Sequence, residues 1–225
     1  MENHYISSPV VDLGTVEYLE ALNIQKWVVE RVKEGYFGDV LIFLDHPPVF
    51  TIGRRNIPEN YRGVQVVETE RGGDVTYHGP GQLVVYPVIN LEKNGLFDVR
   101  KFVNLMEEIV ISSLLKLGYE GKTGEEPGIW VGGKKVASIG IAIRDKISFH
   151  GISINVGSEA LAGFSRIRPC GMPSAVMGYI PVERELLEGE ITGFFNERLH
   201  EFRRMSRSEF MNMFLSSIEE STTPH

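Results

Sequence analysis

The sequence is poor in cysteine, in long apolar runs and in basic charge, and each shortage excludes a class of protein. Its 225 residues include one cysteine, Cys170, so no disulfide can form within the chain. No apolar run approaches the roughly 20 residues of a membrane-spanning helix, and the amino terminus lacks the basic and apolar regions of a signal peptide. We therefore expect a cytoplasmic protein without a membrane partner. Acidic residues outnumber basic ones 30 to 23, and the net charge of −7 argues against a nucleic-acid partner.

Two further absences concern ligands. The chain contains neither GxGxxG after a first strand nor GxxxxGK[ST], the glycine-rich loops that commonly hold nucleotide phosphates. Its six histidines do not cluster with acidic residues or with the cysteine as metal ligands do. The sequence therefore predicts no metal site and no phosphate-binding loop.

Apolar periodicity predicts three helices and a strand-rich middle. Helical patterns begin at Thr15, Asp98 and Ser206, and the first two end at Gly35 and Gly118. Strand-like runs occupy 39–45, 47–53, 64–69, 83–89 and 128–156, the last including a hairpin that turns at Asp145-Lys146. The helical residues expected to face inward are Val16, Leu19, Leu22, Trp27, Val28, Val32, Val99, Phe102, Met106, Ile109, Val110, Leu114, Leu117, Phe210, Met213 and Phe214.

The chain is expected to form one domain over 1–225, with its core at about 10–200 and a helix and polar tail at 206–225. A hydrophobic content of 42% is enough for a sizeable core. Because hairpins are mixed with helical crossovers, we expect an α/β (α+β) fold in which a mixed sheet is covered by helices mainly on one face. The polar segment 216–225 is expected to be disordered.

The segment 71–82, RGGDVTYHGPGQ, is the densest functional signal. Its four glycines and six polar side chains suit a ligand-lining loop better than a core strand, because buried polar groups need partners. Gly72 and Gly73 allow the backbone to approach a ligand closely. The alternative is a structural turn in which His78 caps a neighbouring backbone group.

The single cysteine has two interpretations. Free cysteine is often an inert core residue, and that interpretation stays open. However, Cys170 lies between Pro169 and Gly171 in the run IRPCGM, which favours a tight, approachable loop over a core strand.

Five motifs together resemble the lipoyl(octanoyl) transferases, the lipoate-protein ligase B-type family. They are HPPVFTIGRR at 46–55, RGGDVTYHGPGQLVVYP at 71–87, GIWVGGKKVASIGIAI at 128–143, SFHGISINV at 148–156 and IRPCGM at 167–172. The resemblance implies the fold of biotin and lipoate protein ligases, with a tunnel for an acyl chain. It also implies transfer of octanoyl from octanoyl-acyl carrier protein to a lysine of a lipoyl domain, the first step of endogenous protein lipoylation.

The resemblance also assigns residues and partners. It matches Cys170 to the acyl-thioester cysteine and Lys135 to its partner lysine. The substrate-binding residues that it implies are Arg71, Gly72, Gly73, Asp74, Val75, Thr76, Tyr77, His78, Ser138, Ile139, Gly140, Gly151, Ile152 and Ser153. The acceptors it implies are lipoyl domains of 2-oxoacid dehydrogenase complexes and the glycine cleavage H protein. No ATP or metal cofactor is implied, and we expect a monomer.

One departure from the family's pattern and one question of register qualify these assignments. Where the family commonly has a threonine-serine pair after a valine, this chain has Met177-Gly178. Lys134 precedes Lys135, and in a strand the two side chains point to opposite faces; alignment of KVASIG favours Lys135.

The dyad is chemically reasonable without the resemblance. A thiolate attacks a thioester, and a nearby ammonium stabilises that thiolate. Lys135, once neutral, can accept a proton from the attacking amine. His78 is a competing base, for which we favour substrate positioning, and the amides near Cys170-Gly171 or Gly72-Gly73 are candidates for an oxyanion hole.

Three alternatives remain at this stage. The first is an ATP-dependent lipoate or biotin ligase of the same fold, the second a thioesterase, and the third a non-catalytic module that binds acyl carriers or lipoyl domains. Since such partners tend to be acidic, docking would need a basic rim, for which Arg54, Arg55, Arg62 and Arg144 are candidates.

Overall fold

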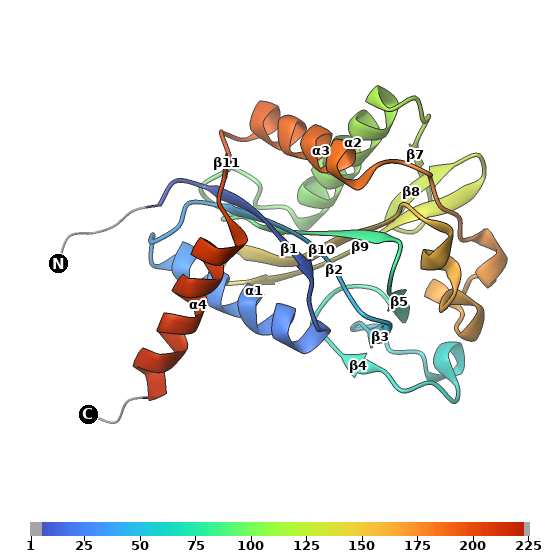
Figure 1. Cartoon of the computed structure of the whole chain (residues 1–225). Coiled ribbons are helices and arrows are strands. Elements are labelled where there is room, and N and C mark those ends of the chain that lie inside the picture. Colours follow the sequence, from blue (N-terminus) through green and yellow to red (C-terminus); the bar gives the residue numbers. More distant parts are fainter. Residues whose placement is uncertain (1–5, 223–225) are drawn as a thin grey trace.

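A mixed eight-stranded sheet organises the chain (Figure 1). The structure is a computed structural model that describes residues 6–222. In spatial order the strands are β11 (Arg203–Arg204), β1 (Pro9–Thr15), β2 (Val40–Asp45), β6 (Gln82–Val88), β10 (Ile147–Asn155), β9 (Lys134–Arg144), β8 (Gly128–Val131) and β7 (Lys122–Thr123). β1 pairs in parallel with β2 and β11, and the other pairs are antiparallel, so the predicted mixed sheet is confirmed.

Helices cover both faces of this sheet, so the expectation of one main face is wrong. Leu41 and Phe43 of β2 pack in the cluster that includes α2 (Val99–Lys116) and α3 (Arg184–Arg198). Ile42 and Leu44 point the other way, into the cluster with α1 (Tyr18–Lys33) and α4 (Arg207–Thr222). Central strands buried on two faces read as continuous apolar runs, which is why β2 shows no alternation. Figure 1 shows the two helix pairs on opposite sides.

Of the first two helices, only α2 begins at a side-chain cap. Asp98 caps α2 by accepting a hydrogen bond from the Arg100 amide at 2.8 Å, as predicted. Thr15 is not a cap, because it is the last residue of β1 and the helix begins at Tyr18. Leu19 and Val99, expected to face inward, lie in the first turns of their helices and are 59% and 49% exposed.

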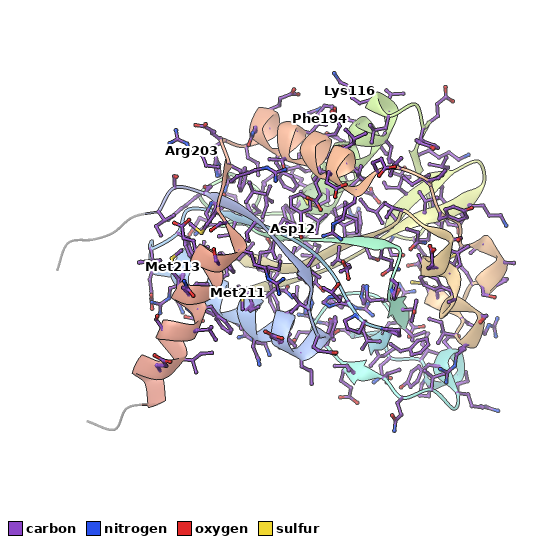
Figure 2. All side chains as sticks on the ribbon, in the orientation of Figure 1. Asp12, Lys116, Phe194, Arg203, Met211 and Met213 are labelled. Atoms are coloured by element: carbon purple, nitrogen blue, oxygen red, sulfur yellow. The ribbon has the colours of Figure 1, made fainter. Side chains whose placement is uncertain are left out.

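The carboxyl-terminal part contains more regular structure than predicted. The segment 184–198 forms α3, which the sequence analysis did not identify. At the other end of the chain, the sequence analysis also missed the strand β1. The tail expected to be disordered from 216 continues α4 as far as Thr222, and 223–225 lie outside the described residues. Phe210 and Phe214 anchor α4, and Met211 and Met213, labelled in Figure 2, pack against the same cluster.

The β9–β10 hairpin turns at Asp145-Lys146, as predicted. Both residues have positive φ, 50° and 66°, which is the geometry of a two-residue turn that matches the twist of the strands. Neither residue is glycine, so the turn is made without the residue that usually supplies this geometry.

A second, three-stranded sheet lies beside the large one (Figure 1). Its order is β4 (Val67–Glu68), β3 (Val49–Ile52) and β5 (Thr76–His78). The sequence analysis treated 71–82 as a loop, but Thr76–His78 pairs with β3. Single-turn 3-10 helices, at Pro58–Tyr61, Ser158–Leu161, Phe164–Arg166, Pro169–Gly171 and Ser174–Val176, complete this side. No helix in the described part of the chain is long and apolar enough to cross a membrane.

Candidate active site

One cavity of about 200 Å³ contains almost all of the residues singled out from the sequence. Those that line it are Arg71, Gly72, Gly73, Asp74, Val75, Thr76, His78, Lys135, Ser138, Ile139, Gly140, Gly151, Ile152, Ser153 and Cys170. Tyr77 does not: its side chain points into the apolar cluster of the small sheet and packs edge-on against Phe164. Segments separated by up to a hundred residues thus meet at one place.

Small residues form the floor of the cavity. Gly140 lies opposite Gly151, and Ser138 opposite Ser153, in the register of β9 and β10. Because residues two apart on a strand share a face, these four lie together on one surface of the sheet. Their small side chains leave room above the sheet for an apolar chain.

The turn 71–73 forms the roof. Its three carbonyls lie so close to Gly53 that a Cβ atom there would come within 2.8 Å of each. The Arg71 guanidinium donates to Thr51 O at 2.9 Å and to Gly72 O at 3.0 Å. Its aliphatic part packs on Gly140, and burial lowers its pKa. Arg71 therefore braces the roof against the floor.

A β-bulge turns the Lys135 side chain into the cavity. In the pairing of β9 with β8, Ala137 lies opposite Ile129 and Lys135 opposite Trp130, which leaves Val136 as the extra residue. Under strict alternation Lys135 would face away from Ser138, and one extra residue reverses that. Lys135 lines the cavity as a result.

Lys135 is almost completely buried. Only 2% of its surface is exposed, and burial lowers its pKa, because desolvation disfavours the charged form. The negative charges of Cys170, Glu126 and Glu107 act in the opposite direction. The lysine is thus held among acidic groups in a site with little water.

Lys134 points to the opposite face and is exposed. Its ammonium donates to the Ala175 carbonyl at 2.6 Å, and its Cβ lies where a side chain at Gly178 would have to be. The Met177-Gly178 segment, which departs from the family's pattern, is bound to β9 here, with the Gly178 amide donating to the Lys135 carbonyl at 2.9 Å.

The Cys170 loop is braced from the other side of the cavity. Cys170 itself has φ 52° and ψ 31°, an uncommon conformation for a residue other than glycine. The Arg168 amide donates to the Asn60 carbonyl at 2.8 Å, and the Asn60 side chain donates to Asp74 at 2.5 Å. Asp74 also accepts from the Ile57 amide at 3.1 Å. The sequence analysis missed Asn60, since nothing in its surroundings marks it.

His78 is neutral at physiological pH. Burial places its pKa well below the usual value, and its Nδ1 lies 3.3 Å from Gln82 Oε1, so this nitrogen carries the hydrogen. The alternative in which His78 caps a neighbouring backbone group is wrong, because its Nδ1 bonds to the Gln82 side chain. His46 stands beside it, donating from Nδ1 to Val16 O and accepting the Tyr86 hydroxyl at Nε2, both at 2.7 Å. Burial lowers the pKa of His46 to about 4.

Two of the suggested oxyanion donors are already engaged. The Gly171 amide donates to the Arg168 carbonyl at 2.9 Å, and the Gly72 amide to the Ile141 carbonyl at 3.0 Å. The candidates that remain are the amides of Cys170 and Gly73. Both belong to segments that line the cavity.

Of the four arginines proposed as a rim, only Arg55 lines the cavity. It forms a two-pronged ion pair with Glu126, at 2.9 and 3.3 Å. Arg144 lies at the hairpin end of β9 and pairs with Glu70 at 3.3 Å.

Within residues 6–222, no group of three or more His, Cys, Asp and Glu side chains is placed to hold a metal ion.

Comparisons with known proteins show what the chain is similar to. The family model of the lipoyl protein ligase A/B catalytic domain matches residues 17–180. The chain is 38% identical over 207 residues to an octanoyltransferase of Alkaliphilus metalliredigens, covering 84% of this chain and 93% of the relative. It is 41% identical over 203 residues to the octanoyltransferase of Geobacter metallireducens, with the same two coverages.

A solved structure shares the fold. A lipoate-protein ligase A bound with ATP superposes with a TM-score of 0.76 at 18% identity, covering 96% of this chain and 95% of the other. The expected similarity to the fold of lipoate protein ligases is therefore confirmed.

Proposed function

The chain belongs to the lipoyl protein ligase A/B catalytic domain family, and we propose that it is an octanoyltransferase that passes the octanoyl group through Cys170 to a lysine of a lipoyl domain. The donor in this proposal is octanoyl-acyl carrier protein. The observation that carries the proposal is the buried Lys135 ammonium in the same cavity as the only cysteine.

In the first half-reaction the Cys170 thiolate attacks the thioester carbonyl. A bond forms between Sγ and the acyl carbon, and the bond from that carbon to the phosphopantetheine sulfur breaks. The Lys135 ammonium gives its proton to the departing thiolate. Both bonds are thioesters, so the exchange changes the free energy little, and the activation brought by the donor is kept.

In the second half-reaction the lysyl amine of the acceptor attacks the acyl carbon. The carbon–nitrogen bond forms, the bond to Cys170 Sγ breaks, and neutral Lys135 takes the proton that the amine loses. The site returns to thiolate and ammonium. Burial supports the role of Lys135 as proton donor, because a desolvated lysine gives up its proton more readily than an exposed one.

The cavity suits an octanoyl chain. The floor of Gly140, Gly151, Ser138 and Ser153 leaves space above the sheet, and apolar walls come from residues such as Val84 and Met177. Burial of an apolar chain here contributes roughly 0.8 kcal/mol per methylene group. Chain binding therefore places the thioester at the Cys170 end without further polar contacts.

Partners and conditions follow from this chemistry. The acceptors proposed are the lipoyl domains of 2-oxoacid dehydrogenase complexes and the glycine cleavage H protein, reached in the cytoplasm by a monomer. The proposed reaction requires neither ATP nor a metal, because the thioester is already activated. Identities of 38% and 41% to octanoyltransferases favour this reaction over that of an ATP-dependent ligase, to which the likeness is one of fold.

A mass assay of the acceptor tests the function. Purified enzyme is mixed with apo lipoyl domain and either octanoyl-acyl carrier protein alone or free octanoate with ATP and magnesium. We expect octanoylated domain only from the carrier-bound donor. Modification only from free octanoate and ATP would establish a ligase, and release of octanoate without modification a thioesterase.

A further inference from the structure

Glu107 is a buried carboxylate on the face of α2 that meets the cavity. Val103 and Val99, one and two turns earlier on the same face, line the cavity. Glu107 is 8% exposed, and its Oε1 accepts the Gly128 amide at 3.0 Å. The helix thereby reaches the first residue of β8, next to the active site.

Gly128 lies directly beneath Lys135. A Cβ atom at this position would come within 2.7 Å of Lys135 Cε, and the residue has φ 141°, a conformation that suits glycine. The hydrogen bond from Gly128 to Glu107 therefore fixes the piece of backbone on which the lysine side chain rests.

The negative charges of three groups, each from a different element, raise the pKa of Lys135 against the effect of burial. They are Cys170 of the cysteine loop, Glu126 of the loop before β8 and Glu107 of α2. Glu126 is already neutralised by its two-pronged pair with Arg55. Among the described residues, no lysine or arginine nitrogen lies within ion-pair distance of Glu107, and Lys134 points to the other face. Of these two carboxylates, only Glu126 is paired with an arginine.

We propose that Glu107 is a positioning residue for Lys135, holding the Gly128 backbone under the lysine side chain and supplying the negative charge that keeps Lys135 basic when Cys170 is acylated. The proposal rests on the proposed function in one respect, since acylation removes the thiolate charge. Lys135 is neutral once it has protonated the leaving thiol, and without a second anion its pKa would be so low that it would be a weak base when the acceptor amine must be deprotonated. Glu107 keeps the base strong through the second half-reaction.

The charge of Lys135 is measured by trace labelling with acetic anhydride as a function of pH, with peptide mass spectrometry as the readout. All variants carry Cys170→Ser, whose hydroxyl is uncharged like the acylated thiol. Glu107→Gln keeps an oxygen that accepts from Gly128 and removes the charge. The matched control is Glu108→Gln, the next residue, which is exposed and pairs with Arg198.

We expect Glu107→Gln to lower the midpoint of Lys135 labelling by about one pH unit and Glu108→Gln to leave it unchanged. An unchanged midpoint in folded Glu107→Gln would overturn the proposal. Glu107→Asp keeps the charge and withdraws the carboxylate from Gly128. Its midpoint should stay near that of the parent while octanoyl transfer, measured with Cys170 restored, slows about tenfold. A midpoint as low as that of the glutamine variant would contradict a role for charge.

The labelling needs neither donor nor acceptor. If the chain does not transfer octanoyl groups, the transfer assay fails while the shift in the labelling midpoint is still observed. A wrong assignment of Glu107 gives the reverse result, with transfer intact and no shift.

Discussion

The Cα atom of Gly128 lies so close to the Lys135 side chain that a methyl group at position 128 would reach within 2.7 Å of Cε. The same methyl group would come within 2.3 Å of the Ala137 carbonyl oxygen. Gly128 therefore makes the space in which the lysine extends, and the position of a reactive group depends on the absence of a side chain at this residue.

Gly128→Ala should lower the rate of octanoyl transfer about 10- to 100-fold, because misplaced catalytic groups lose much of the benefit of orientation. The control is Gly133→Ala, in the same hairpin, where φ is also positive at 80° but nothing lies within 4 Å of a Cβ atom. Backbone strain is common to both variants. Equal loss of rate in the two would refute a specific role of the space under Lys135.

Lys135→Arg should acylate Cys170 but fail to complete transfer. Arginine keeps the positive charge that favours the thiolate, yet it does not give up a proton near neutral pH. Rapid-quench mass spectrometry would show the octanoyl adduct accumulating on the enzyme, with at least a 100-fold slower loss to the acceptor. Transfer at the wild-type rate would mean that the lysine acts only through its charge.

Asn60→Leu should weaken the brace between Asp74 and the cysteine loop. The substitution leaves a buried Asp74 oxygen without its donor, which costs about 1–3 kcal/mol in the free energy of unfolding, measured by urea denaturation. Acylation of Cys170 should also slow, since the loop loses its support. Tyr61→Phe is the control, because its hydroxyl bonds only to exposed Asn56. A stable variant with normal acylation would show that the contact is incidental.

Stability should fall between about pH 6.5 and pH 4 because of His46. Its pKa is 6.5 when unfolded and about 4 when folded, so the unfolded chain binds the proton more tightly and acid favours unfolding. The stability in question is fully present above pH 6.5, and its loss amounts to roughly 3 kcal/mol by pH 4. Urea denaturation at several pH values should show a smaller slope in His46→Gln than in wild type. His200 is partly exposed and provides the control, His200→Gln. Identical slopes in His46→Gln and wild type would contradict the assignment.

Particular residues show how far the sequence leads. Asp98 caps α2 and Asp145-Lys146 closes a hairpin because these are local interactions between neighbours in the chain. The helix α3 was missed because its buried stripe, Leu187, Ile191 and Phe195, is narrow and two glycines lie between its members.

The site was predictable as a set of segments and unpredictable in its geometry. The motifs indicated Lys135, but the bulge at Val136 that turns it inward depends on the pairing with β8. Asn60 lies in the 3-10 turn Pro58–Tyr61 and Glu126 in the loop before β8, and neither has a distinguishing pattern around it. Glu107 had a signal: it interrupts the apolar face of a predicted helix between Val103 and Val110, which marks a buried charge in need of a partner.

The most direct test of the account is the intact mass of the enzyme after mixing with octanoyl-acyl carrier protein in the absence of ATP, before and after apo lipoyl domain is added. We predict one octanoyl adduct on wild type that maps to Cys170 and moves to the domain, and neither adduct nor transfer in Cys170→Ser. Octanoyl transfer by Cys170→Ser at the wild-type rate would contradict the covalent mechanism.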